Sequence, residues 1–305
     1  MLQLFSILLA LIAGHSCRKL PVSQGVLNAI LNASVLIILF IMGYDFGGSA
    51  SSMLTEILKL LKQVITFTFF LLLFNFSFCA IFDCFQSKKR PQVILKPNLH
   101  FLSAIFSSGK YVLYVIGGIT VGYFLKFNIN FTYLDTVISI ILFIILFIIG
   151  HQLRLQGISL KNILANKLGF VIALIIIISS FLAAIVCSEI LNLNLKSALM
   201  LSSGFGWYTL SGILNGQLIS HTMGTTSFFI DFFREIIAIL LIPALGTRYS
   251  IPIIGYCGAT ALDFTLPIIK ENLGDAKVPI AITSGMILTV LVPLLIPLIA
   301  SLGIL

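Results

Sequence analysis

Three ionisable residues stand close together inside an apolar stretch of this 305-residue chain. Asp231, Arg234 and Glu235 have the i, i+3, i+4 spacing that places side chains on one helical face. A charge at the centre of a bilayer costs about 2.5–3.5 kcal/mol on insertion scales, so such residues mark substrate paths, ion sites or proton relays. Asp263 lies in another apolar stretch and Asp45 ends a third. All five residues are therefore candidates for binding a substrate or a proton.

The balance of charge among these residues favours a cation or a proton. Arg234 is expected to neutralise Asp231 or Asp263 in a buried pair, which leaves surplus carboxylates. A carboxylate in a dry interior either holds a proton or binds a cation. Asp45 stands at the end of its segment, so an ordinary place at the membrane interface is an alternative to a functional role.

Two apolar segments, 197–219 and 251–269, are interrupted by glycine and proline next to these carboxylates. Backbone that leaves the helix inside a membrane must be buried in protein or line a watery cavity. Interrupted helices offer free N–H groups to an anion and free carbonyl groups to a cation, which suits a zwitterion with an additional amine. The candidate positions at these breaks are Gly204, Gly206, Gly258, Thr260 and Thr265. Trp207 and Tyr208 beside the first break are candidates either for cation–π contact or for core packing.

The composition indicates where these segments lie. Hydrophobic residues make up 59% of the chain and charged residues 9%, with a mean hydropathy of +1.15, whereas globular domains carry about a quarter charged residues. The sequence predicts an all-α polytopic membrane protein with a single transmembrane domain over residues 1–305. The net charge of +8 is assigned to loop anchors and not to nucleic-acid binding. No metal or cofactor is predicted, because the five cysteines form no C-x-x-C motif.

Hydropathy predicts ten apolar segments: 2–14, 22–43, 64–82, 101–125, 134–150, 168–191, 197–219, 227–245, 251–269 and 279–303. Because two of them are interrupted, we expect about eight full spans plus two broken or re-entrant segments. The odd-numbered loops carry most of the 18 Lys and Arg residues. They are therefore expected inside, with both termini outside.

A short internal similarity bears on the topology. The stretch 37–43 recurs almost unchanged as 144–150, and both stretches end in glycine. The predicted orientation makes these two helices run in opposite directions, as in an inverted repeat. Chance similarity in a chain so rich in Ile, Leu and Phe is the alternative.

Two other functions are alternatives to binding a cation: transport of an organic anion and intramembrane hydrolysis. An ion-coupled carrier of an organic anion would rely on Arg234 and the helix N-termini. An intramembrane hydrolase could start from Tyr44-Asp45, but the only second candidate, Gly274-Asp275, lacks the preceding glycine of a Gly-x-Gly-Asp motif and lies in a polar loop. The sequence therefore predicts a protein that is not an enzyme.

Three sequence blocks resemble the signature of the LysO-type lysine exporter family. They are SGFGWYTLSG at 203–212, FREI at 233–236 and GATALDFTLP at 258–267, and the likeness covers roughly residues 195–300. The chain departs from the expected pattern at Cys257, Asp231 and Ala261, where Gly, Asn and Ser are expected.

The resemblance implies an exporter of L-lysine and toxic lysine analogues in the bacterial inner membrane. It also implies about eight spans, outside termini, and a role in transport for Asp45 and Glu235. No nucleotide-binding loop is present in the sequence, so the expected mechanism is secondary transport, with protons or another coupling ion exchanged for lysine. The sequence predicts neither the stoichiometry nor the oligomeric state.

Overall fold

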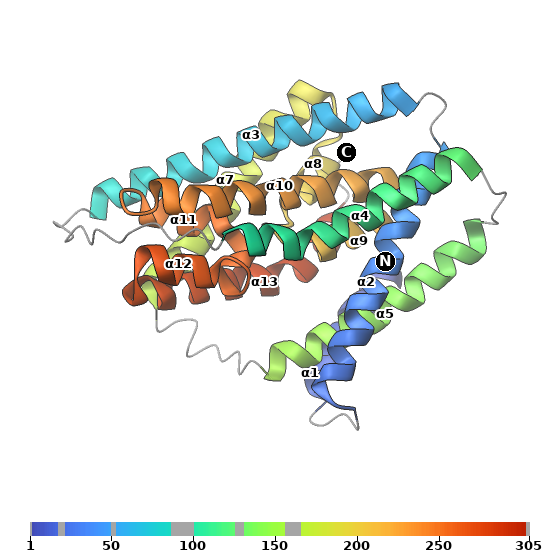
Figure 1. The fold of residues 1–305 in the computed structure, drawn as a ribbon, viewed down its shortest axis with the longest axis horizontal. Helices are drawn as coiled ribbons and strands as arrows, with labels where there is room; N and C mark the ends of the chain where they lie inside the picture. Colours follow the sequence, from blue (N-terminus) through green and yellow to red (C-terminus); the bar gives the residue numbers. More distant parts are fainter. Residues whose placement is uncertain are drawn as a thin grey trace.

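The computed structural model describes residues 2–17, 22–49, 53–86, 101–125, 131–155 and 166–302. Within these ranges all regular structure is helical, which confirms the predicted all-α class (Figure 1). The helices are α1 (Leu2–Ser16), α2 (Gln24–Ser49), α3 (Met53–Gln86), α4 (Phe101–Leu125), α5 (Phe131–Leu155), α7 (Lys167–Leu191), α8 (Leu195–Ser202), α9 (Tyr208–Leu218), α10 (His221–Leu245), α11 (Ser250–Cys257), η1 (Gly258–Leu262), α12 (Leu266–Leu273), η2 (Asp275–Lys277) and α13 (Val278–Ser301).

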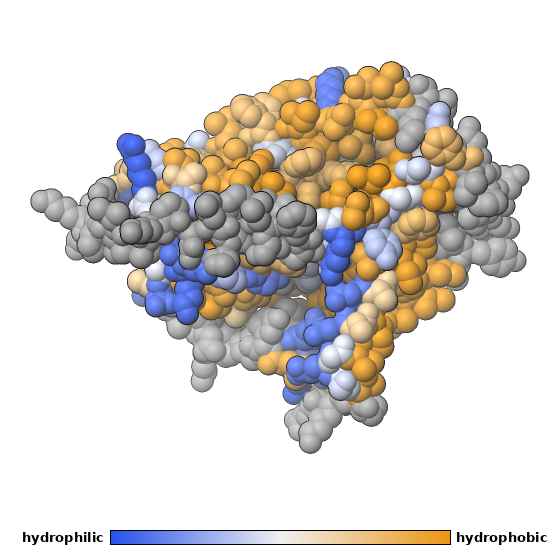
Figure 2. Space-filling view, viewed as in Figure 1, coloured by the Kyte–Doolittle hydropathy of each residue, from blue (hydrophilic) through white to orange (hydrophobic). Residues whose placement is uncertain are grey.

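Several helices have the length and composition that a membrane requires. Four stretches among the described residues, 24–48, 54–85, 167–191 and 275–301, are long and apolar enough to cross a bilayer. Large hydrophobic side chains such as Leu54, Phe85 and Leu113 point outward, and hydrophobic residues cover much of the face drawn in Figure 2. An apolar exterior of this extent is the surface that lipid covers. The chain is a multi-pass membrane protein.

Glycines bring α2 and α4 into backbone contact. A methyl group added at Gly118 would clash with the backbone oxygen of Phe40, and one added at Gly122 with that of Tyr44. On the facing helix, Gly43 and Gly47 meet the backbone of α4 in the same way. The contacts advance together along both helices, so α2 and α4 run parallel. Small residues at this spacing let membrane helices approach closely.

The same device joins α1 to α5. Methyl groups added at Gly14 or Gly150 would meet the backbone of the opposite helix. Arg154 Nη1, near the end of α5, donates a 2.8 Å hydrogen bond to the backbone oxygen of His15 near the end of α1. Gly43 and Gly150 end the two similar stretches of the sequence, and each lies at the close backbone contact of one helix pair. Their shared role gives the internal similarity a structural counterpart.

The second interrupted segment turns back on itself. From α10 the chain enters α11, leaves the helix through η1, and returns in α12. A methyl group added at Gly246, which follows α10, would lie 2.5 Å from Cδ2 of Leu273 at the end of α12. Helices α11 and α12 therefore start and finish at one end of the bundle, at the left of Figure 1. We call residues 250–273 hairpin 2.

The first interrupted segment turns back at the opposite end. Helix α8 follows the end of α7, and Leu193 before it packs on the same apolar cluster as Met223 at the start of α10. The two arms of the segment are also connected directly, because Asn215 Nδ2 in α9 donates to the backbone oxygen of Met200 in α8 at 3.3 Å. We call residues 195–218 hairpin 1. The basic cluster Lys88-Lys89-Arg90 with Lys96 falls outside the described residues.

The glycine contact between α2 and α4 can be tested by adding one methyl group. Gly118→Ala should destabilise the protein by about 1–3 kcal/mol, because the new Cβ overpacks a rigid backbone contact. Gly109→Ala in the same helix meets no atom within 4 Å and should be neutral or slightly stabilising. Thermal unfolding of the purified variants in detergent measures the difference. Equal melting temperatures would contradict the contact.

Candidate functional site

The tips of the two hairpins meet inside the protein. Phe205 and Gly206 at the tip of hairpin 1 have φ values of +48° and +94°, and Gly258 at the tip of hairpin 2 has φ of +65°. The backbone N–H of Ala259 donates to the backbone oxygen of Phe205 at 2.8 Å. A methyl group at Gly258 would clash with that same oxygen. Glycine is therefore required here both by conformation and by close approach.

Asp231 binds the tip of hairpin 1 from α10. Its side chain is 1% exposed. Oδ1 accepts from the N–H of Gly206 at 2.8 Å, and Oδ2 accepts from the hydroxyl of Ser211 at 2.5 Å. Helix α9 has no side-chain cap of its own, and Asp231 places a negative charge near its N-terminal end, where the helix dipole stabilises it. A methyl group at Gly204 would clash with this carboxylate.

Arg234 does not form the pair that the sequence suggested. Its Nε donates to the backbone oxygen of Tyr256 at 2.9 Å, and its guanidinium lies 5.3 Å from the centre of the Tyr256 ring. Over the described part of the chain no ion pair joins it to Asp231 or Asp263. The expectation of a buried ion pair is wrong because Tyr256 lies in the last turn of α11. The negative end of a helix dipole takes the place of a carboxylate there.

Glu235 lies on α10, near Tyr111 of α4 and Cys257 of hairpin 2. The side chain is fully buried. It is within electrostatic reach of Tyr111 on α4 and of Cys257 at the end of α11. Helix α10 starts at His221, earlier than the predicted segment 227–245, so Glu235 is close to the middle of the helix. This is the position expected of a membrane-embedded site.

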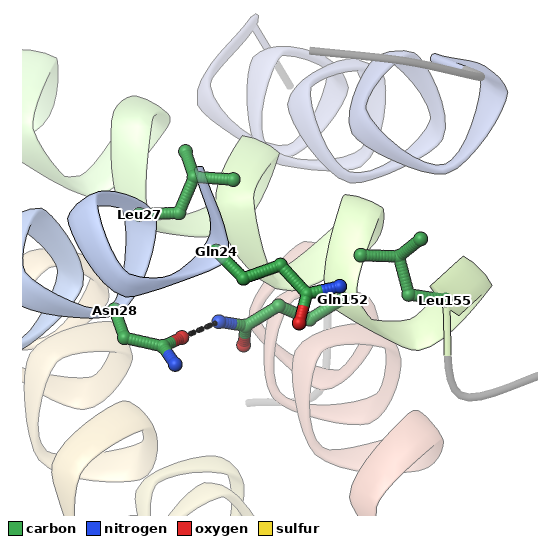
Figure 3. A pocket seen from close by; sticks show the side chains of 5 residues that line it. All are labelled: Gln24, Leu27, Asn28, Gln152 and Leu155. Carbon is green, nitrogen blue, oxygen red and sulfur yellow. Dashed lines mark hydrogen bonds between the residues drawn. The ribbon is translucent and has the colours of Figure 1, made fainter. Parts of the chain in front are cut away.

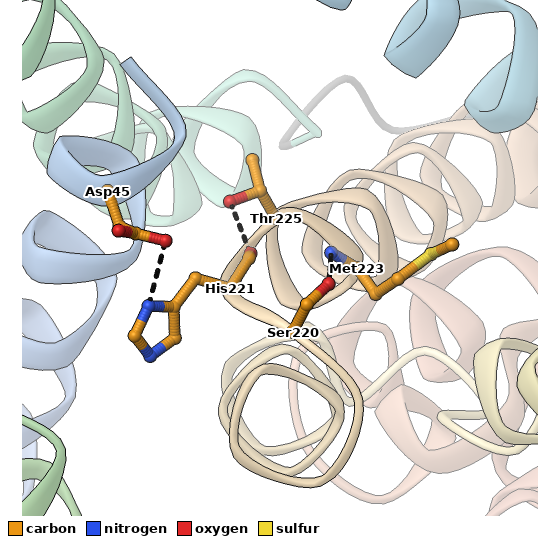
Figure 4. A network of polar contacts seen from close by, with 5 residues as sticks. All are labelled: Asp45, Ser220, His221, Met223 and Thr225. Carbon is orange, nitrogen blue, oxygen red and sulfur yellow. Dashed lines mark hydrogen bonds and ion pairs between the residues drawn. The ribbon is translucent and has the colours of Figure 1, made fainter. Parts of the chain in front are cut away.

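Asp45 makes an ion pair that hydropathy gave no reason to expect. Its Oδ2 lies 3.0 Å from Nδ1 of His221 at the start of α10 (Figure 4), and the two side chains are 21% and 12% exposed. A histidine changes its charge near neutral pH more readily than other side chains. The pair also shows that the end of α2 and the start of α10 share one end of the bundle. Asp45 is therefore near hairpin 1 and is not among the residues around Glu235.

Asp263 is the one predicted carboxylate that the structure leaves exposed. Its Oδ1 accepts from the neighbouring N–H of Phe264 at 2.6 Å. The two threonines of this break are buried and bind backbone carbonyls. Thr260 Oγ1 donates to Cys257, and Thr265 Oγ1 donates to Thr260. The first carbonyl ends α11 and the second belongs to η1, so both hydroxyls hold the backbone of this break.

The aromatic candidates differ from each other. Tyr208 is buried, and its ring makes edge contacts with Tyr111, Phe228 and Phe232 at centroid distances of 5.5–5.7 Å. Trp207 is partly buried and packs on the same core. Core packing, one of the two predicted roles, therefore describes both rings in this conformation. The aromatic layer also connects hairpin 1 to α4, where Tyr111 approaches Glu235.

Two cavities open at opposite ends of the bundle. One, of about 310 Å³, is lined by the beginnings of α3 and α10, including Glu56, Lys59 and Thr222. The other, of about 370 Å³, lies between the start of α2 and the end of α5 (Figure 3). In the second cavity, Gln152 Nε2 donates to Asn28 Oδ1 at 2.8 Å. Neither cavity was predicted from the sequence, because each is made by residues far apart along the chain.

A bundle of apolar helices with two interrupted hairpins meeting beside buried charges is the architecture of a membrane transporter. The lysine exporter LysO family model matches residues 112–300, more than half of the chain. The chain belongs to the lysine exporter LysO family.

Individual relatives agree with this membership. The lysine exporter LysO of Escherichia coli K12 is 45% identical over 148 residues, which are 48% of this chain and 50% of that protein. A putative lysine exporter of Haemophilus influenzae is 42% identical over 147 residues, which are 48% of this chain and 75% of that protein. The alignment thus spans half the length of the Escherichia coli protein. No solved structure matches the chain.

The contact between the hairpin tips can be tested at Gly258. Gly258→Ala should abolish transport while the protein stays inserted, because the added Cβ separates the tips. Gly274→Ala is the control, since Gly274 also has positive φ, at +85°, but lies after α12. It should lose only the roughly 1–3 kcal/mol of a residue held in a backbone region that is essentially specific to glycine and keep its transport. Transport assays with quantified membrane protein compare the two, and normal transport by Gly258→Ala would contradict a functional contact.

Proposed function

We propose that the chain exports L-lysine and lysine analogues across the bacterial inner membrane, as a secondary transporter that exchanges them for protons. The observation that carries this proposal is the buried carboxylate of Glu235 beside the tip of hairpin 2, in a chain that belongs to the lysine exporter family. The names of the two relatives support lysine as the substrate.

Glu235 is suited to exchanging two cations. A carboxylate buried near mid-membrane is stable when it is neutralised, either by a proton or by a bound ammonium group. If it cannot hold both at once, release of one cation accompanies binding of the other. Proton exchange through a single carboxylate then needs no further titrating group.

The membrane potential explains why a counter-ion is useful. Moving a monovalent cation outward against 100 mV, inside negative, costs about 2.3 kcal/mol. One proton entering for each lysine leaving cancels this electrical work. The same ratio follows from a single carboxylate that alternates between the two ions.

We propose eight full spans: α1, α2, α3, α4, α5, α7, α10 and α13. In this arrangement hairpin 1 enters from the outside and hairpin 2 from the inside. The charge distribution of the loops supports outside positions for both termini. The ion pair of Asp45 with His221 agrees with this arrangement, because it requires the end of α2 and the start of α10 to face the same side.

Glu235→Gln keeps the shape of the side chain but cannot ionise. We expect it to lower lysine export by about tenfold or more and to remove the dependence on the pH gradient. The measurement is lysine efflux from preloaded cells at several external pH values. Glu189→Gln, at an exposed position of α7, makes the same chemical change and should export normally. Normal, pH-dependent export by Glu235→Gln would place the proton site elsewhere.

The orientation can be tested with a native thiol. Cys84 near the end of α3 is exposed, and the proposed topology places it inside. With the other cysteines replaced, a membrane-impermeant maleimide should label Cys84 in inverted vesicles and not in intact cells. Thr222→Cys at the start of α10 should show the opposite pattern. Labelling of Cys84 in intact cells would reverse the topology.

An organic anion is the second candidate substrate, because Arg234 is buried and Nη1 and Nη2 have no hydrogen-bond partner among the described residues. A counterflow assay in liposomes separates the two substrates. Exchange of labelled lysine with unlabelled lysine or arginine supports the proposal, whereas exchange only with glutamate or a bile acid overturns it.

A further inference from the structure

Two of the free N–H groups expected at the interrupted helices, one at each hairpin tip, are occupied in this structure. The N–H of Gly206 binds Asp231, and the N–H of Ala259 binds the backbone oxygen of Phe205. These donors are therefore not open to the carboxylate of an amino acid. The carboxylate of a zwitterionic substrate at the hairpin tips therefore needs a donor other than these two.

Arg234 has two side-chain nitrogens that no acceptor among the described residues uses. Its side chain is 1% exposed, and Nη1 and Nη2 are buried with no hydrogen-bond partner in the described part of the chain. Nε is held by Tyr256, which fixes the plane of the guanidinium. A buried charged donor without a partner is costly and calls for an explanation. Two adjacent nitrogens of a fixed guanidinium have the geometry that binds both oxygens of one carboxylate.

In the described part of the chain, neither Asp231 nor Asp263 forms an ion pair with these nitrogens. Asp231 directs both oxygens to hairpin 1, and Asp263 is exposed. Arg234 and Glu235 are adjacent on α10, and both act electrostatically on Cys257 at the end of α11. Both charges therefore lie near the tip of hairpin 2. This arrangement complements a molecule that carries both a carboxylate and an ammonium group.

We propose that Nη1 and Nη2 of Arg234 bind the α-carboxylate of the exported amino acid and so distinguish amino acids from diamines. The inference rests on the proposed function and adds the part of the substrate that Glu235 does not recognise. A diamine would leave the buried guanidinium unpaired, and sites of this kind reject ligands that lack the matching group. A methyl group at Gly258 would lie 3.1 Å from Nη2, so the substrate reaches Arg234 when the tip of hairpin 2 withdraws.

The test compares lysine with cadaverine, which is lysine without its carboxyl group. Purified full-length protein in liposomes exchanges labelled lysine, and unlabelled lysine, lysinamide or cadaverine competes. In the unmodified protein, cadaverine and lysinamide should compete about 10- to 100-fold more weakly than lysine, the range for charge-assisted hydrogen bonds. Arg234→Gln should reduce this preference to about threefold or less, chiefly by weakening lysine binding. Where exchange becomes slow, ligand-induced thermal stabilisation reports the same affinities.

Two further variants guard against a general loss of folding. Arg234→Lys keeps the charge but not the paired donors, and should retain only part of the preference for lysine. Arg248→Gln is the matched control, because Arg248 also lies over a tyrosine ring, Tyr249 at 5.2 Å, but is exposed. It should keep the full preference.

The outcomes separate the two proposals. A protein that binds lysine and cadaverine equally well, or an Arg234→Gln variant with the original preference, overturns the inference and leaves lysine export intact. A protein that exchanges no lysine overturns the proposed function, and the inference with it.

Discussion

The hydrogen bond from the N–H of Ala259 to the backbone oxygen of Phe205 satisfies a requirement that applies to the whole molecule. Inside a bilayer each backbone group must find a partner within the protein, and two interrupted hairpins leave many groups open. The tips satisfy some of these backbone groups by hydrogen bonding to each other. Asp231 and Arg234 satisfy more of them, the acid at the N-terminal end of α9 and the base at the C-terminal end of α11. Both charges therefore lie where a helix dipole stabilises them.

Charged side chains that bind backbone groups explain which parts of the site could be predicted from sequence. The spacing of Asp231, Arg234 and Glu235 correctly indicated buried charges on one helix, and the glycines correctly indicated interrupted backbone. The partner of Arg234 could not be predicted, because it is a backbone carbonyl and any residue provides one. Asp263 stands in an apolar stretch, but hydropathy does not reveal which way one side chain of a turn points.

Long-range contacts were the other limit. His221 at the start of α10 pairs with Asp45 on α2. No periodicity connects positions so far apart. Glycine spacing was more informative, because Gly43 and Gly150 recur in similar stretches and each closes a helix pair. Hairpins 1 and 2 turn back at opposite ends of the bundle. With this arrangement, the pairs α2–α4 and α1–α5 are compatible with the predicted inverted repeat.

The thiol of Cys257 can report the separation of the two hairpin tips. The thiol lies at the end of α11, fully buried, directly before the glycine that touches hairpin 1. While the tips are together, a thiol reagent cannot reach it. Its alkylation rate therefore counts how often hairpin 2 leaves its partner, much as hydrogen exchange counts the openings of a buried amide. Substrate would then change the speed of a chemical reaction at a residue outside the proposed lysine and proton sites.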